Sequence, residues 1–138
     1  MIDFSTDLGK RALRLLREET VIWLTTVAPD GTPQPRPVWF TWDGSSILLY
    51  SQPKAHKISH LEKCPRVAVH FNTDKDGSEV VVLTGEGRVD REAPPADRHR
   101  EYVAKYRQGI ADLEMTPESF AADYSTPITV MPTRLRGL

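Results

Sequence analysis

Residues 34–61 have the sequence QPRPVWFTWDGSSILLYSQPKAHKISHL, which predicts the order of elements in the first half of the chain. A strand is expected over residues 34–42, a turn at Asp43-Gly44-Ser45-Ser46, and a second strand over residues 47–50. The second strand is continuously apolar, which is typical of a strand covered on both faces. Pro53 then suits the first turn of a helix, because the N–H that proline lacks has no partner there.

The sequence on the N-terminal side predicts a helix and a strand. Apolar side chains recur at helical spacing over residues 7–18, and Thr6 or Asp7 can cap the start of this helix. Residues 20–28, TVIWLTTVA, are β-branched and apolar, as is typical of a strand. Pro29-Asp30-Gly31-Thr32 is a strong turn signal, so this strand is expected to end there.

The sequence on the C-terminal side predicts further strands with helices between them. Strands are expected over residues 66–72, 79–91 and 126–135, and helices over residues 94–107 and from Thr116 onward. Gly85 and Gly87 indicate a bulge or bend in the long strand, which a sheet needs in order to curl into a barrel. Glu101 and Lys105 have the spacing of a helical ion pair.

The whole pattern predicts one α+β, mainly β, domain over residues 1–138. About six mostly antiparallel strands with three or four peripheral helices are expected, and the closely spaced turns favour a barrel. The net charge of −1 lacks the basic excess of nucleic-acid-binding proteins. No apolar run has the length of a signal peptide or a membrane span. The single Cys64 excludes an internal disulfide, and we expect a soluble cytoplasmic protein without nucleic-acid or membrane partners.

A candidate anion site lies at the start of the predicted helix, at Ser51-Gln52-Pro53-Lys54-Ala55-His56-Lys57. A helix N-terminus presents unpaired backbone N–H groups and a partial positive charge. Lys54 and Lys57 are three residues apart, so both can reach the same side of the first turn, and Ser51 adds a hydroxyl. Together these groups can bind a phosphate. The same residues equally fit a structural role, with Ser51 as a helix cap and the lysines on a solvated face.

The predicted strand before this corner has an unusual proline content. Pro35 and Pro37 cannot donate to a sheet, so this segment must be an edge strand or must face a ligand. Gln34 and Arg36 share one face and could be polar handles for a planar heterocycle lying along the backbone. A purely structural edge strand is the alternative, and we assign Phe40 and Trp42 to the core.

The histidines give no catalytic or metal site in the sequence. His56 and His60 have the i, i+4 spacing that can hold a metal, but no third ligand is evident, so we place both on the helix surface. His70 is expected to be a hydrogen-bonded sheet residue, and His99 to lie within a charged helix. No nucleophile stands in a recognisable catalytic setting. If the protein is an enzyme, a bound cofactor must therefore carry the reaction.

Five short motifs, in their order and spacing, resemble one known family. They are Val27-Ala28-Pro29-Asp30-Gly31, Pro33-Gln34, Pro37-Val38-Trp39-Phe40, Lys57-Ile58-Ser59-His60-Leu61 and Cys64-Pro65-Arg66-Val67. In these motifs the chain resembles the pyridoxamine 5'-phosphate-oxidase-like split-barrel flavoproteins. More narrowly, it resembles their actinobacterial branch of deazaflavin (F420)-dependent oxidoreductases.

This resemblance implies a split β-barrel homodimer with two cofactor sites at the subunit interface. It implies that the cofactor ring lies along residues 34–40, and that the phosphate-bearing tail meets the corner at residues 51–57. The implied cofactor-binding residues are Gln34, Arg36, Pro37, Val38, Trp39, Ser51, Gln52, Lys54, His56 and Lys57. Related proteins often have an arginine two residues before the lysine, where this chain has Ala55, and Lys54 would supply that charge.

The implied activity is that of an F420-dependent oxidoreductase. It would transfer a hydride between the reduced deazaflavin and a small unsaturated or conjugated substrate, with no side chain as nucleophile and no metal. An FMN-dependent oxidoreductase of the same fold is the first alternative, although the dianionic phosphate of FMN would want more cations than this corner offers. A flavin or deazaflavin carrier without turnover is the second alternative.

Overall fold

Seven strands form one sheet in a computed structural model that describes all 138 residues. Their order is β2-β1-β5-β6-β7-β4-β3, and every neighbouring pair is antiparallel. The strands are β1 (Ile22–Val27), β2 (Pro33–Val38), β3 (Thr41–Trp42), β4 (Ile47–Ser51), β5 (Arg66–His70), β6 (Val81–Val89) and β7 (Thr126–Gly137). The helices are α1 (Asp7–Glu18), α2 (His56–Lys63), α3 (Arg100–Asp112) and α4 (Pro117–Asp123), with a 3-10 turn at Ala96–Arg98. None of these helices is long and apolar enough to cross a membrane. The predicted α+β class with a mainly antiparallel sheet is confirmed.

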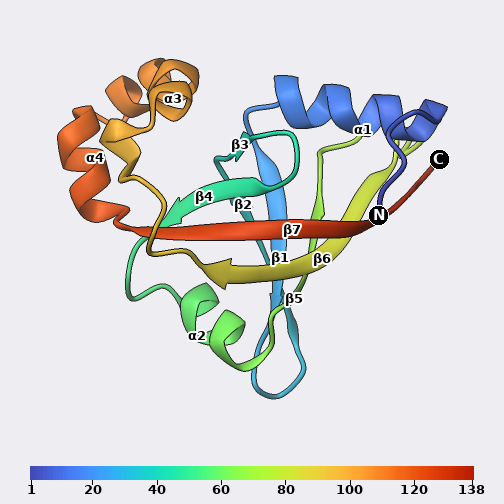
Figure 1. The fold of residues 1–138 in the computed structure, drawn as a ribbon, viewed down its shortest axis with the longest axis horizontal. Coiled ribbons are helices and arrows are strands. Elements are labelled where there is room, and N and C mark those ends of the chain that lie inside the picture. The colour runs from blue at the N-terminus through green and yellow to red at the C-terminus, as the bar shows by residue number, and fades with distance from the viewer.

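The sheet curls because its two outermost strands are neighbours in the sequence. β2 lies at one edge and β3 at the other, and only Trp39 and Phe40 separate them along the chain. Strands in a flat sheet lie about 4.8 Å apart, so two residues could not span its full width and the edges must approach each other. Figure 1 shows the half-open barrel that results. The single strand predicted over residues 34–42 is therefore wrong, because this segment forms two strands at opposite edges.

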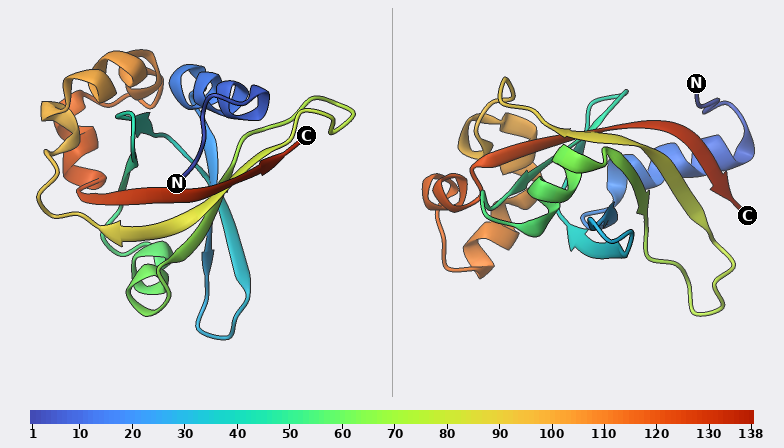
Figure 2. Two further views of the ribbon diagram at one scale, coloured as in Figure 1. Left: turned by 45° about the vertical axis from the view of Figure 1, so that its right-hand side comes forward. Right: turned by 90° about the horizontal axis from the view of Figure 1, so that it is seen from below.

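β6 and β7 are long strands that bend at the predicted glycine. Their register shifts between Thr84 and Gly85. A Cβ atom on Gly85 would lie 2.0 Å from the carbonyl oxygen of Met131, so only glycine lets the two backbones approach this closely. Away from this bend, the turn regions around residues 28–32 and 74–78 extend out from the barrel (Figure 2).

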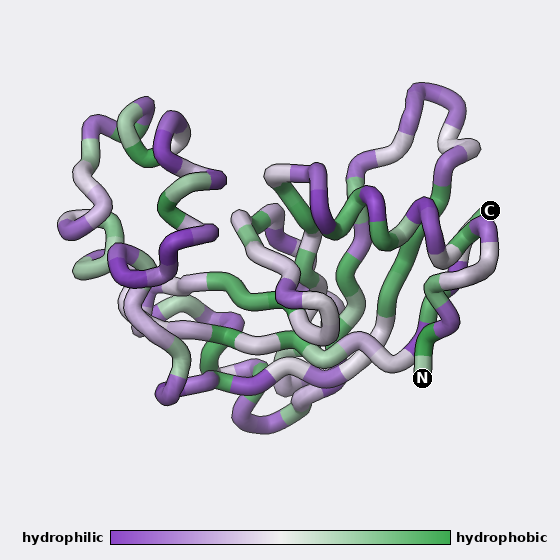
Figure 3. Tube along the Cα trace, turned by 45° about the horizontal axis from the view of Figure 1, so that its top comes forward, coloured by the Kyte–Doolittle hydropathy of each residue, from purple (hydrophilic) through white to green (hydrophobic).

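The main hydrophobic core fills the inside of the barrel, and α1 closes it. The core contains 16 buried residues, with Ala12 and Leu16 of α1 among them. Phe40 belongs to it as predicted. α1 has the predicted bounds and begins after Thr6, whose hydroxyl accepts a hydrogen bond from the Gly9 backbone N–H at 2.9 Å. Figure 3 shows hydrophobic residues gathered along the strands and hydrophilic residues along the loops.

A second, smaller cluster lies where α3 and α4 pack beside the barrel (Figure 1). Its six buried residues are Tyr50, Ala96, Tyr102, Tyr106, Ile110 and Phe120. His99 does not lie within the helix as predicted, but caps α3 by accepting the Tyr102 backbone N–H at 3.1 Å. The predicted ion pair between Glu101 and Lys105 does not form. Instead, the Lys105 amine turns to the barrel and donates to the Phe40 carbonyl at 2.9 Å.

Candidate functional site

The corner at residues 51–57 differs from its prediction. α2 begins at His56 and not at Pro53, because β4 continues its pairing with β7 through Ser51. Ser51 is buried and its hydroxyl donates to the Gln52 carbonyl at 3.0 Å, so it does not cap the helix. The start of α2 has no side-chain cap, which leaves N–H groups of its first turn available to solvent or to a ligand.

A cavity of about 410 Å³ lies between this corner and the β1–β2 hairpin, and we call it the cationic cavity. Its lining residues are Thr26, Gln34, Arg36, Ala55, His56, Lys57 and His60. The set combines an arginine, a lysine and two histidines with no aspartate or glutamate. The cavity therefore has the composition of an anion site.

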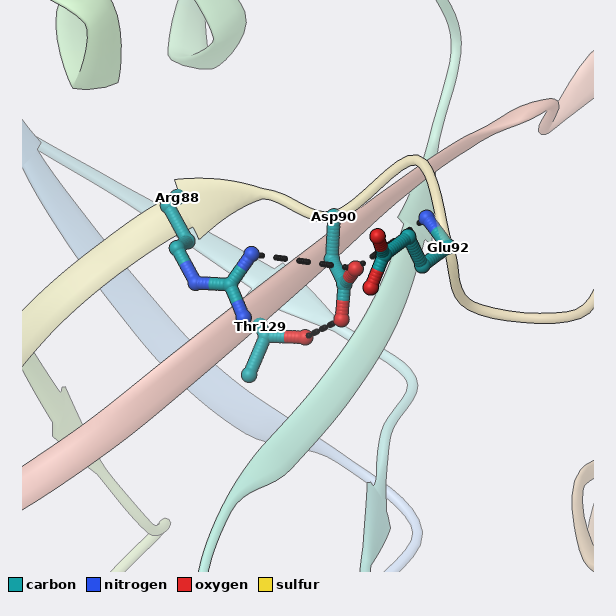
Figure 4. Close-up of polar contacts among 4 residues, drawn as sticks. All are labelled: Arg88, Asp90, Glu92 and Thr129. Atoms are coloured by element: carbon teal, nitrogen blue, oxygen red, sulfur yellow. Dashed lines mark hydrogen bonds and ion pairs between the residues drawn. The ribbon is translucent and has the colours of Figure 1, made fainter.

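The arginine and the lysine of this cavity have no carboxylate partner. The chain contains one ion pair, in which Arg88 Nη1 lies 3.7 Å from Asp90 Oδ1, and Asp90 also accepts the Thr129 hydroxyl at 3.0 Å (Figure 4). Arg36 and Lys57 are thus unpaired. Burial, and then the positive charge of Arg36, lower the pKa of Lys57. A half-buried amine beside a like charge gains stabilisation from any anion that enters the cavity.

His60 is a member of this cavity that the sequence placed wrongly. The prediction put it on the helix surface, but it is buried, because α2 packs this side against β1. Its Nδ1 lies 2.8 Å from the Thr26 hydroxyl, which leaves Nε2 as the free ring nitrogen. The ring of His56 lies 6.3 Å away, and no group of three potential metal-ligating side chains is brought together.

A second cavity of about 180 Å³ adjoins the first, and we call it the aromatic cavity. Its lining residues are Pro37, Val38, Trp39, Tyr50, Lys57, Tyr102, Leu113, Phe120 and Tyr124. Lys57 lines both cavities. A molecule with an anionic group and a flat apolar part could therefore contact both.

Trp39 forms the centre of the aromatic wall and is held by α3 and α4. Its ring stacks on Tyr106 with centroids 4.7 Å apart and on Phe120 with centroids 5.5 Å apart. A Cβ atom on Gly109 would lie 2.9 Å from the Trp39 ring, so glycine lets α3 approach it. The Tyr106 hydroxyl accepts the Phe40 backbone N–H at 2.7 Å, which fixes the crossing between the two sheet edges.

Seven of the ten implied cofactor residues line one of the two cavities. Those in the cationic cavity are Gln34, Arg36, His56 and Lys57, and those in the aromatic cavity are Pro37, Val38 and Trp39, again with Lys57. Ser51, Gln52 and Lys54 line neither, and Lys54 is exposed in the turn before α2.

The sequence analysis missed the residues that other elements bring to these cavities. Thr26 comes from β1, and the aromatic wall comes from α3 and α4, more than 60 residues along the chain from Trp39. The spacing of Tyr102 and Tyr106, one helical turn apart, was the available signal that α3 buries an aromatic face.

Comparisons with known proteins agree on one fold. A family model described as pyridoxamine 5'-phosphate oxidase matches residues 8–136. The solved structure of an F420 reductase is 27% identical, covers 89% of this chain and 94% of its own, and has a TM-score of 0.65. No protein of curated function matches the sequence.

Two more distant structures share the fold. An FAD-binding protein from Mesorhizobium loti is 18% identical over 92% of this chain and 89% of its own, with a TM-score of 0.68. The haem storage protein HutZ from Vibrio cholerae is 13% identical over 96% of this chain and 95% of its own, with a TM-score of 0.64.

Proposed function

The chain belongs to the pyridoxamine 5'-phosphate oxidase family, and on that premise we propose that it is an oxidoreductase that uses coenzyme F420. It would transfer a hydride between the deazaflavin and a small unsaturated or conjugated substrate. The observation that carries this proposal is the cationic cavity, with unpaired Arg36 and Lys57, directly beside the aromatic cavity. The 27% identity to an F420 reductase supports the choice of cofactor.

The cationic cavity fits the phosphate of such a cofactor. Arg36 and Lys57 can each donate charge-assisted hydrogen bonds, which are roughly twice as strong as neutral ones. His60, held by the Thr26 hydroxyl, can add its Nε2 as a third donor. One arginine and one lysine suit the singly charged phosphodiester of a deazaflavin better than the dianionic phosphate monoester of FMN.

The ring of the cofactor would lie along β2, towards Trp39. Five of the six residues of this edge strand are exposed. Alternate residues from Pro33 to Pro37 lack N–H groups, so the backbone there offers chiefly carbonyl acceptors to a ligand. The bound cofactor supplies the hydride chemistry, and the chain's own residues bind, orient and shield the reacting groups. No side chain needs to act as a nucleophile.

We further propose that two copies of the chain form a homodimer over the exposed β2 edge, with a cofactor site at each interface. An exposed sheet edge normally requires protection, and both cavities lie beside this strand. Light scattering after size exclusion should give twice the 15.6 kDa mass of one chain. A monomer mass at micromolar concentration would overturn the dimer and leave the cofactor proposal standing.

Cofactor titrations followed by fluorescence test the proposal. F420 should bind at micromolar concentration or tighter, and more tightly than FMN. Stronger binding of FMN would favour the FMN-dependent alternative, and haemin is a third titrant because a haem storage protein shares the fold. Stopped-flow oxidation of the bound, reduced cofactor by cyclic enones and quinones then separates an enzyme from a carrier. Inertness across that panel would contradict turnover.

A further inference from the structure

The hydroxyl of Tyr102 has no partner in the protein. Tyr102 is only 1% exposed. The two tyrosines beside it are both engaged, since the Tyr50 hydroxyl donates to the Pro94 carbonyl at 2.7 Å and the Tyr106 hydroxyl bonds to Phe40. Buried polar groups are satisfied in most proteins, so this unpaired hydroxyl requires an explanation.

The free hydroxyl has access to the aromatic cavity. Trp42 Nε1 is the only fully enclosed side-chain nitrogen or oxygen without a partner. The Tyr102 hydroxyl, which also lacks one, therefore keeps some accessible surface, and Tyr102 lines the aromatic cavity. Burial, and then the neighbouring tyrosines, raise the pKa of Tyr102. The group is thus a neutral O–H donor throughout the physiological range.

The aromatic cavity has room for about one ring. An apolar cavity of about 150 Å³ binds benzene, so a cavity of about 180 Å³ accommodates one substituted six-membered ring. The three fused rings of a flavin or deazaflavin would extend out of it. Seven of its nine lining residues are hydrophobic, which suits a single ring, and Lys57 places the cavity next to the cationic cavity.

We propose that the aromatic cavity binds a flat, single-ring conjugated carbonyl compound whose oxygen accepts a hydrogen bond from the Tyr102 hydroxyl. This inference rests on the proposed function, since it gives the substrate class for the hydride transfer. A phenylalanine at position 102 would pack equally well, and the hydroxyl serves no structural partner. A ligand with an acceptor atom on its edge would satisfy this hydroxyl.

A saturation-transfer NMR titration with acetophenone tests the proposal directly. Ethylbenzene, which has the same ring but no carbonyl, is the comparison compound. Acetophenone should bind the wild-type protein, and Tyr102→Phe should weaken that binding about 5- to 10-fold, the usual worth of one hydrogen bond. Ethylbenzene should bind both proteins equally. Tyr50→Phe is the matched control, because it removes a hydroxyl of the same cavity lining that already donates to the Pro94 carbonyl, and it should leave acetophenone binding unchanged.

Three results would overturn the inference. They are no binding of acetophenone, an equal effect of Tyr102→Phe on both probes, and a loss of F420 affinity in Tyr102→Phe while acetophenone binding is unchanged. The last result would assign the hydroxyl to the cofactor ring. If F420 binds and acetophenone does not, only this inference fails. If acetophenone binds through Tyr102 and F420 does not bind, the proposed function fails instead.

Discussion

Replacing Tyr106 with phenylalanine should destabilise the protein by about 2 kcal/mol. The Tyr106 hydroxyl accepts the Phe40 backbone N–H at 2.7 Å and lies 2.8 Å from the Thr20 carbonyl, to which it can donate. The Phe40 carbonyl also accepts a hydrogen bond from the Lys105 amine, and Thr20 is exposed to water. Both carbonyls therefore keep a hydrogen-bond partner in the variant. The Phe40 N–H is fully buried, and an unsatisfied buried donor costs about 1–3 kcal/mol.

The expected change is large enough to measure by thermal unfolding. An unfolding entropy of about 2.1 cal/mol/K per residue gives about 290 cal/mol/K for 138 residues, so about 2 kcal/mol lowers Tm by about 7 °C. Urea unfolding should show the same loss with an unchanged m value. Tyr102→Phe, one turn earlier in α3, removes a hydroxyl without a protein partner and should change stability by less than about 0.5 kcal/mol. Equal effects of the two substitutions would refute this account of how α3 is attached.

Three further predictions concern other parts of the molecule. Burial, and then a nearby guanidinium, lower the pKa of Lys57, and a bound anion favours the protonated amine. Cofactor affinity should therefore fall as alkaline pH rises through that pKa, with proton uptake seen by calorimetry in two buffers. Gly85→Ala should cost at least about 3 kcal/mol because its Cβ would meet Met131, whereas Gly77→Ala, at φ 67° in open space, should cost about 1 kcal/mol in the same unfolding assay. Burial lowers the pKa of Lys105 to about 8 from 10.5, so the unfolded chain binds more protons between these values and stability from this site rises with pH. Lys105→Met should lack that rise between pH 8 and pH 10, and an identical pH profile would disprove the assignment.

The local sequence pattern was sufficient to predict those elements whose defining residues lie close together in the sequence. The bounds of α1 follow from amphipathic spacing and the Thr6 cap, and the bend at Gly85 follows from a residue that only a close backbone approach requires. The resemblance also led to the right family. The first two features depend on residues within one turn or one strand, and the resemblance depends on the order and spacing of short motifs.

The features that sequence could not predict depend on long-range packing. Nothing near Trp39 indicates that the chain crosses from one sheet edge to the other there. Lys105 has a suitable helical partner in Glu101, but the buried Phe40 carbonyl and ring attract it instead. His60 looked like a surface residue because its partner, Thr26, lies 34 residues earlier in the chain.

The same limit applies to the candidate site. The sequence predicted that the helix begins near Pro53, which placed Lys54 and Lys57 together on its first turn. The later start of α2 separates them, and only Lys57 reaches the cavities. The aromatic wall comes from helices that no motif in residues 34–61 could indicate.

The affinity of F420 for Lys57→Met and Lys54→Met, measured side by side by fluorescence titration, tests most directly whether the cationic cavity holds the cofactor's anionic tail. Each substitution removes one positive charge and keeps a similar apolar stem. A hydrogen bond to a charged group is worth about 1.5–3 kcal/mol, so Lys57→Met should weaken binding about 10- to 100-fold. Lys54→Met should stay within about twofold of the wild type, because an exposed charge contributes little. Equal losses in the two variants, or a larger loss in Lys54→Met, would contradict the assignment of the cationic cavity as the cofactor site.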